Sequence, residues 1–203
     1  MKEFWDERYS STEFVFGKTP NEFLVSQYHR IKLGRVLCLA EGEGRNAVFL
    51  AGKGYDVTAV DQSKRGLEKT KALGREFGVE ITTIEADLND FQIKSASWDG
   101  IISISAHLPP SLRKAIHQQV VSGLNGGGVL ILEAYTEKQL EMPGVGGPPA
   151  HQKEMFMSLP ELKAELTGLN FVVATETERQ FDEGTRHQGL SAVVQVVAEY
   201  NGD

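Results

Sequence analysis

The sequence predicts an α/β protein with a doubly wound sheet of seven strands and helices on both faces. Apolar runs of strand length alternate with segments of helical periodicity between residues 36 and 135, which is typical of a mostly parallel sheet. The last two runs are separated by the loop 181–189. A parallel crossover needs a longer connection, so we expect the last strand to run antiparallel.

Each element is expected from its own pattern. Residues 21–31 carry apolar side chains at helical spacing, with Thr19 or Asn21 as the cap. The glycines at 126–128 are expected to end a helix before the fifth strand. The expected strands are 36–40, 55–61, 81–86, 98–105, 129–135, 171–177 and 190–200, and the other expected helices are 44–53, 63–77, 111–124 and 158–166.

Composition limits the classes of function. We expect residues 1–203 to form a single domain, because 40% hydrophobic residues are enough for one core. A formal charge of −7 disfavours nucleic acid or an anionic membrane as the main partner. Neither a signal-peptide pattern nor a long apolar run occurs, so we expect a soluble, cytoplasmic protein. The single cysteine and the histidine spacing predict no metal site.

The turn after the first expected strand is the most informative segment. Residues 36–40 are apolar or small, Gly42 and Gly44 allow close backbone approach, and residues 46–51 have the pattern of a helix. Ligands of open α/β sheets bind beyond the carboxyl ends of the strands. The turn, which includes Ala40, Glu41 and Arg45, is therefore a candidate site for a nucleotide-containing cofactor.

Two further strands end in acidic residues. Asp61, followed by Gln62, ends the second strand about 20 residues after the glycine turn, a position suited to accept hydrogen bonds from ribose hydroxyls. Asp87, followed by Leu88, ends the third. Gly42, Gly44 and Ala47 also fit the dinucleotide pattern, so a nicotinamide cofactor stays open from the residues alone. Glu41 favours a cationic ligand instead, one with an ammonium and a sulfonium.

The chain resembles the class I S-adenosylmethionine-dependent methyltransferases over nearly its whole length, and is most similar to their tellurite-resistance and thiopurine-methyltransferase-like branch. The segments that carry the resemblance are Phe4–Tyr9, Phe16-Gly17, Pro20-Asn21, Glu41–Ala47, Val60-Asp61, Ala86–Leu88 and Arg186-His187. The resemblance implies a Rossmann-like fold with strand order 3-2-1-4-5-7-6 and S-adenosylmethionine as the cofactor.

The resemblance also implies roles for individual residues. The glycine turn would hold the methionine part, with Ser105 beside it. Asp61 would bind the ribose, and Asp87 would bind the adenine amino group with Leu88 nearby. Family members often have an acid where this chain has Cys38 and a glycine where it has Ala40, and Glu41 is a candidate to supply the missing charge.

We expect the methyl acceptor to bind to loops at the edge of the sheet where the parallel strands end. The aromatic segment 1–20 is a candidate lid, 136–157 a substrate-side loop, and Arg186, His187 and His107 candidate catalytic residues. Arg186 would attract an anionic acceptor, while His187 or His107 would take a proton.

Together these features predict methyl transfer to a small nucleophile, such as a thiol, selenium or tellurium species. The alternatives are a short NAD(P)-dependent oxidoreductase and a non-catalytic S-adenosylmethionine-binding domain.

Overall fold

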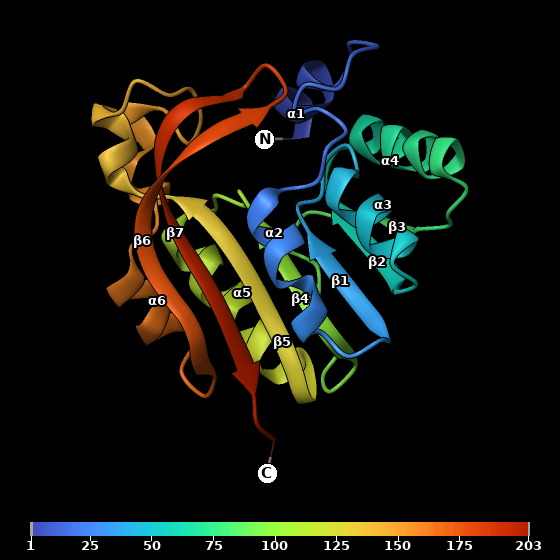
Figure 1. Ribbon diagram of the computed structural model, residues 1–203, viewed down its shortest axis with the longest axis vertical. Helices are drawn as coiled ribbons and strands as arrows, with labels where there is room; N and C mark the ends of the chain where they lie inside the picture. The colour runs from blue at the N-terminus through green and yellow to red at the C-terminus, as the bar shows by residue number, and fades with distance from the viewer. Residues whose placement is uncertain (1, 203) are drawn as a thin grey trace.

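The strand ends that matter for function belong to one twisted sheet, seen in a computed structural model that describes residues 2–202 (Figure 1). The sheet has seven strands in the order β3-β2-β1-β4-β5-β7-β6. Strands β1 to β5 run parallel to one another, and β7 is antiparallel to both β5 and β6. The strands are β1 (Arg35–Leu39), β2 (Asp56–Asp61), β3 (Thr82–Glu85), β4 (Trp98–Ile104), β5 (Leu124–Tyr135), β6 (Asn170–Glu183) and β7 (His187–Tyr200). The predicted fold class and strand order are confirmed.

Helices cover both faces of the sheet. Helices α2 (Glu22–Gln27), α3 (Arg45–Gly52) and α4 (Lys64–Phe77) place apolar side chains on one face, where Leu24, Leu50 and Leu67 pack against strand residues. Helices α5 (Pro110–Gly123) and α6 (Leu159–Glu165) cover the other face. Central strands that are buried on both faces read as continuous apolar runs, which is why the sequence located them so well.

The chain differs from expectation at the end of α5. The glycines at 126–128 do not cap this helix, because Leu124 already has extended backbone angles and starts β5. The early end is compatible with the fold because Ala96 and Ser97 donate backbone hydrogen bonds to the carbonyl oxygens of Ser122 and Gly123. The glycines instead belong to the first part of the strand.

The last hairpin is longer and its turn tighter than the sequence predicts. Strand β6 continues to Glu183 and β7 begins at His187, so only residues 184–186 connect them. The less exposed positions in the second half of β6 include the charged residues Arg179 and Glu183, so the sequence lacks the apolar alternation that indicates a strand. The predicted loop 181–189 is therefore wrong, and the hairpin tip reaches the edge where the parallel strands end (Figure 1).

Two segments that the sequence marked as loops contain short helices. The N-terminal segment begins with α1 (Lys2–Arg8), which lies at the same edge as the hairpin tip (Figure 1). The segment 136–157 contains the 3-10 helices η2 (Glu137–Glu141) and η3 (Ala150–Met155), and the expected leading helix ends in η1 (Tyr28–Arg30). Among residues 2–202 no helix has the length and apolar character required to cross a bilayer.

Candidate active site

The turn after β1 is folded around left-handed backbone conformations. Gly42 has a φ of 65° and Gly44 a φ of 90°, and the amide of Gly42 donates to Asp61 Oδ2 at 2.8 Å. A Cβ atom on Gly42 would lie 2.6 Å from the Tyr9 hydroxyl, and one on Gly44 would lie 2.7 Å from the Thr70 Cα. Both glycines are therefore required by close approach as well as by φ.

Ala40 shows the cost of one departure from the family pattern. Its φ of 48° is in the left-handed region that glycine tolerates and alanine does not. Ser105, which follows β4, also has a positive φ of 56°, and its amide donates to the carbonyl oxygen of Glu133 at 2.7 Å. Non-glycine residues in this region cost about 1–3 kcal/mol each and tend to lie at functional sites. Two of them follow adjacent strands here.

Glu41 has a role that the sequence did not predict. Its Oε1 accepts hydrogen bonds from the amides of Asn46 at 3.0 Å and Ala47 at 2.9 Å, so the carboxylate caps the first turn of α3. Burial raises the pKa of Glu41 to about 7 despite these bonds. The same carboxylate interacts with the buried Cys38 thiol, whose pKa burial and Glu41 both raise. Glu41 thus interacts with the amides of α3 and with Cys38, and its expected attraction of a cationic ligand stays a prediction.

The ends of β2 and β3 form one side of a small cavity. Asp61 is buried, its Oδ1 accepts from the Ser63 amide at 2.7 Å, and burial raises its pKa. Gln62 and Asp87 line a cavity of about 160 Å³, and Gln62 Oε1 is buried there without a hydrogen-bond partner. Asp87 is exposed and accepts from the Asn89 amide, whereas Leu88 packs in the core.

These features test whether the chain fits the implied cofactor. A glycine turn, a buried acid and an exposed acid follow three adjacent strands, as an adenosine-containing ligand requires. The unpaired Gln62 oxygen marks where a donor is missing, since buried polar atoms are otherwise almost always bonded. The residues present fit S-adenosylmethionine.

Arg45 does not face the glycine turn. Its guanidinium forms an ion pair with Glu183 at 2.7 Å, and its Nη1 donates to the carbonyl oxygen of Thr19 at 3.3 Å. The side chains of Arg45 and Glu183 are both buried, with exposures of 7% and 4%. The side chain therefore ties α3 to the hairpin, and the role in cofactor binding expected of Arg45 does not match these contacts.

The two hairpin candidates lie in different environments. Arg186 is exposed in the turn, whereas His187 is the first residue of β7 and is buried. The His187 ring lies 4.6 Å from the Phe16 ring, and its Nδ1 lies 3.6 Å from Glu183 Oε2 with no hydrogen-bond partner. Burial lowers the pKa of His187, so the ring is neutral at pH 7. A neutral imidazole has one nitrogen that can accept a proton.

His107 is held by the backbone at both ring nitrogens. Its Nδ1 lies 3.0 Å from the carbonyl oxygen of Met155, and its Nε2 accepts from the Tyr135 amide at 3.2 Å. Burial lowers its pKa to about 4. His107 therefore fixes the segment after β5, and its contacts do not match the expected proton transfer.

The N-terminal segment covers the strand ends, as expected of a lid. Asp6 accepts from the Ser63 hydroxyl at 2.6 Å, and the amides of Val15 and Phe16 donate to the Glu43 carboxylate at 3.2 Å. The aromatic residues form a connected series in which Trp5 stacks on Tyr9, at 5.5 Å between ring centroids. The sequence marked these rings but missed the polar anchors Asp6 and Glu43, because their partners are remote in sequence.

The comparisons with known proteins agree with this geometry. Residues 36–128 match the family model described as a methyltransferase domain. An uncharacterized methyltransferase of Bacillus subtilis, YbaJ, is 29% identical over 102 residues, which is 50% of this chain and 40% of that protein. A carboxy-S-adenosyl-L-methionine synthase of Aliivibrio salmonicida is 32% identical over 95 residues, covering 46% and 38% of the two chains. This chain thus spans about two fifths of the length of these curated relatives.

Two solved structures show the same fold. One comes from work on the conversion of a disulfide bond into a thioacetal group during echinomycin biosynthesis, with a TM-score of 0.76 and 17% identity over 99% of this chain and 93% of the other. The other is TehB from Haemophilus influenzae, with a TM-score of 0.72 and 20% identity over 98% and 66% of the two chains. Neither the nicotinamide-dependent nor the non-catalytic alternative is favoured by these matches. The match to a methyltransferase domain covers residues 36–128, and the solved structures share the fold. S-adenosylmethionine is the cofactor that these matches support.

Proposed function

We propose that this protein transfers a methyl group from S-adenosylmethionine to a small nucleophile. The observation that carries the proposal is the grouping of Gly42, Asp61 and Asp87 at the ends of adjacent strands. Gln62 lines a cavity together with Asp87, and its buried side-chain oxygen has no hydrogen-bond partner. In this proposal the glycine turn and Ser105 hold the methionine part, Asp61 the ribose, and Asp87 with Gln62 and Leu88 the adenine. The cofactor supplies an electrophilic methyl group on a sulfonium.

The lid segment excludes water and aligns the reactants. Tyr9 lies against Gly42, and the Phe16 ring contacts the His187 ring. The aromatic rings of residues 5–16 therefore extend from the glycine turn to the hairpin. Holding two reactants in line can lower a barrier by roughly 7–11 kcal/mol in favourable cases. Most of the catalysis can therefore come from alignment, without a strong base.

His187 is the residue proposed to accept a proton. It is neutral at pH 7, and its Nδ1 faces Glu183, whose ionised form is held by nearby cations. Burial disfavours ionisation of Glu183, but the His187 ring and the charges of Arg45 and Arg179 outweigh it and lower its pKa to about 2. A carboxylate at Nδ1 orients the ring and stabilises the imidazolium that forms.

The acceptor class follows from this modest base. A thiol has a pKa of about 8.5, so a weak base is enough to remove its proton near neutral pH. Selenide and reduced tellurium species are already anionic there, which suits a site with one buried histidine. The placement in the tellurite-resistance and thiopurine-methyltransferase-like branch rests on the segments that carry the sequence resemblance, such as Glu41–Ala47 and Arg186-His187. Arg186, one residue before His187, is proposed to attract the anionic acceptor.

A turnover assay tests the proposal. Formation of S-adenosylhomocysteine is followed with thiols, selenite, tellurite, small amines and alcohols. We expect turnover with at least one of the first three groups. His187→Ala should lower kcat by roughly 10²- to 10⁴-fold for acceptors that must lose a proton, and less for acceptors that are already anionic. Unchanged cofactor affinity in this variant is the control. Equal loss for both kinds of acceptor would remove His187 as the base.

A further inference from the structure

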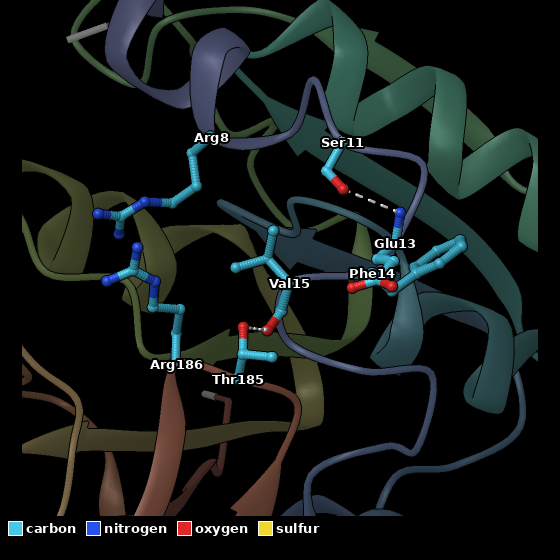
Figure 2. A pocket seen from close by; sticks show the side chains of 7 residues that line it. All are labelled: Arg8, Ser11, Glu13, Phe14, Val15, Thr185 and Arg186. Atoms are coloured by element: carbon cyan, nitrogen blue, oxygen red, sulfur yellow. Dashed lines mark hydrogen bonds between the residues drawn. The ribbon is translucent and has the colours of Figure 1, made fainter.

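A second cavity lies between the lid and the hairpin turn. It has a volume of about 230 Å³ and is lined by Arg8 at the end of α1, by the lid loop after it and by Thr185 and Arg186 of the hairpin turn. Figure 2 shows the two guanidinium groups facing each other across it. Residues 8 and 186 are remote in sequence, and only the fold brings their charges together.

The two arginines lack counter-ions. Among residues 2–202, neither guanidinium forms an ion pair or a hydrogen bond with a carboxylate. Glu13 is the one acidic residue lining the cavity, and its carboxylate lies on the far side from them in Figure 2. Burial and the nearby charge of Arg186 both lower the pKa of Arg8. Two like charges held close together without a partner repel, and an anion placed between them removes this cost.

Contacts around the cavity hold both arginine-bearing segments in place. The Arg8 guanidinium lies 4.4 Å from the Phe4 ring centroid and 5.2 Å from that of Trp5, which stabilises a cation. The hairpin turn is fixed by the Thr185 amide, which donates to the carbonyl oxygen of Val15 at 2.9 Å. These contacts fix the two backbone segments that carry the arginines on opposite sides of the cavity.

We infer that Arg8 and Arg186 form a clamp for an oxyanion of the methyl acceptor, a carboxylate or phosphate group separate from the reacting atom. This inference rests on the proposed function only in identifying the bound molecule as the methyl acceptor. Guanidinium groups bind such oxyanions through paired, charge-assisted hydrogen bonds. Arg186 precedes His187, so an anion held by the clamp places the rest of the acceptor next to the proposed proton acceptor.

The clamp also couples acceptor binding to lid closure. Helix α1 carries Arg8 at its end, and Tyr9 after it lies against the glycine turn. An anion between Arg8 and Arg186 therefore fastens α1 to the hairpin over the cofactor site. Because coupling between two sites is reciprocal, the cofactor should strengthen anion binding by the factor by which the anion strengthens cofactor binding.

Binding measurements test the clamp without requiring turnover. Propionate and inorganic phosphate are titrated into the wild-type protein, with and without S-adenosylhomocysteine, at an ionic strength held constant with sodium chloride. The melting temperature is recorded. We expect saturable stabilisation by at least one anion, and stronger stabilisation when S-adenosylhomocysteine is present. The anion that binds more tightly shows whether the clamp prefers a carboxylate or a phosphate. Arg8→Gln and Arg186→Gln should each weaken binding by roughly 10- to 100-fold, the effect of losing hydrogen bonds to a charged group.

Arg75→Gln is the matched control, since Arg75 is exposed on α4 and does not line the cavity. It should bind the anion as the wild type does. No saturable binding of either anion, or equal weakening in all three variants, overturns the clamp. The stabilisation by S-adenosylhomocysteine alone is read from the same samples. If it is present while anion binding is absent, the clamp fails and the proposed function stands, and if it is absent the proposed function fails.

A kinetic comparison adds the link to catalysis. With 3-mercaptopropionate and neutral 2-mercaptoethanol as acceptors, the clamp predicts a higher kcat/KM for the anionic thiol in the wild type. Arg8→Gln should remove this preference through a higher KM for the anionic thiol. A loss of kcat for both thiols would instead indicate that Arg8 only supports the lid.

Discussion

The two rims of the site are built in different ways. The cofactor rim, formed by the ends of β1, β2 and β3, relies on backbone conformation and short side chains that are close in sequence. The hairpin rim, formed by the ends of β5 to β7, relies on buried charges that are remote in sequence. Arg179, for example, donates to Glu133 at 2.8 Å and to Glu183 at 2.8 Å. The first rim is therefore built from local contacts and the second from contacts between remote segments.

The largest effect is expected where the hairpin rim loses its central charge. Arg179→Met leaves Glu133, with 1% exposure, buried without its cation, and removing one partner of a buried pair costs about 3–5 kcal/mol. The free energy of unfolding, determined in urea for the variant and the wild type, measures this loss of stability. Arg75→Met, an exposed arginine, should stay within about 0.5 kcal/mol of the wild type. Equal effects would show that the hairpin rim is not held by charge.

A slightly smaller effect is expected at the glycine turn. Gly44→Ala places a Cβ atom 2.7 Å from the Thr70 backbone at a φ of 90°, which should cost about 2–4 kcal/mol and abolish stabilisation by S-adenosylhomocysteine. Gly52→Ala is the matched control, because nothing lies within 4 Å of its added atom. It should gain about 0.5–1 kcal/mol, since alanine is the better helix former. Normal cofactor binding by Gly44→Ala would contradict the claim that the cofactor rim depends on backbone conformation.

The pH dependence of stability isolates Glu41. Its folded pKa of about 7 lies above the ordinary 4.5, so its stabilising effect is complete below pH 4.5 and is lost as the pH rises through 7. Between pH 5 and pH 8 the loss is about 2.5 kcal/mol, at 1.36 kcal/mol per unit. Glu41→Gln should lack this component when unfolding curves of both proteins are compared. Parallel pH profiles would show that the cap is ionised without penalty.

The smallest effect is expected at the anchor between lid and cofactor rim. Asp6→Ala removes the hydrogen bond from Ser63 and the one from the Arg65 amide, worth about 1 kcal/mol as a helix cap. We expect S-adenosylhomocysteine to dissociate roughly three- to fivefold faster, the factor equivalent to that energy. Stopped-flow measurements give the rate, and Glu7→Ala, an exposed neighbour on α1, is the control. Equal rates in both variants would remove Asp6 as an anchor.

The same contrast explains what the sequence could predict. The positions of Gly42, Asp61 and Asp87 follow from local patterns, because each lies next to the strand that places it, whereas the strand order was predicted from the family resemblance. The extension of β6 to Glu183, the pairing of Arg45 with that residue and the facing of Arg8 and Arg186 depend on contacts between remote segments. No periodicity or spacing reports such contacts. The remote partners of Arg45 and His107 were missed for this reason, and the expected roles of these residues and the single-domain organisation stay predictions.

The cofactor rim is tested most directly by titrating S-adenosylhomocysteine and NADH side by side into the wild type and into Asp87→Ala, a change at an exposed residue that should not affect folding. We expect S-adenosylhomocysteine to stabilise the wild type by about 2.7 kcal/mol at a hundredfold excess over Kd, Asp87→Ala to bind it more weakly, and NADH to have no effect. Stabilisation by NADH alone, or equal affinity of both proteins for S-adenosylhomocysteine, would contradict an adenosine site at the ends of these strands.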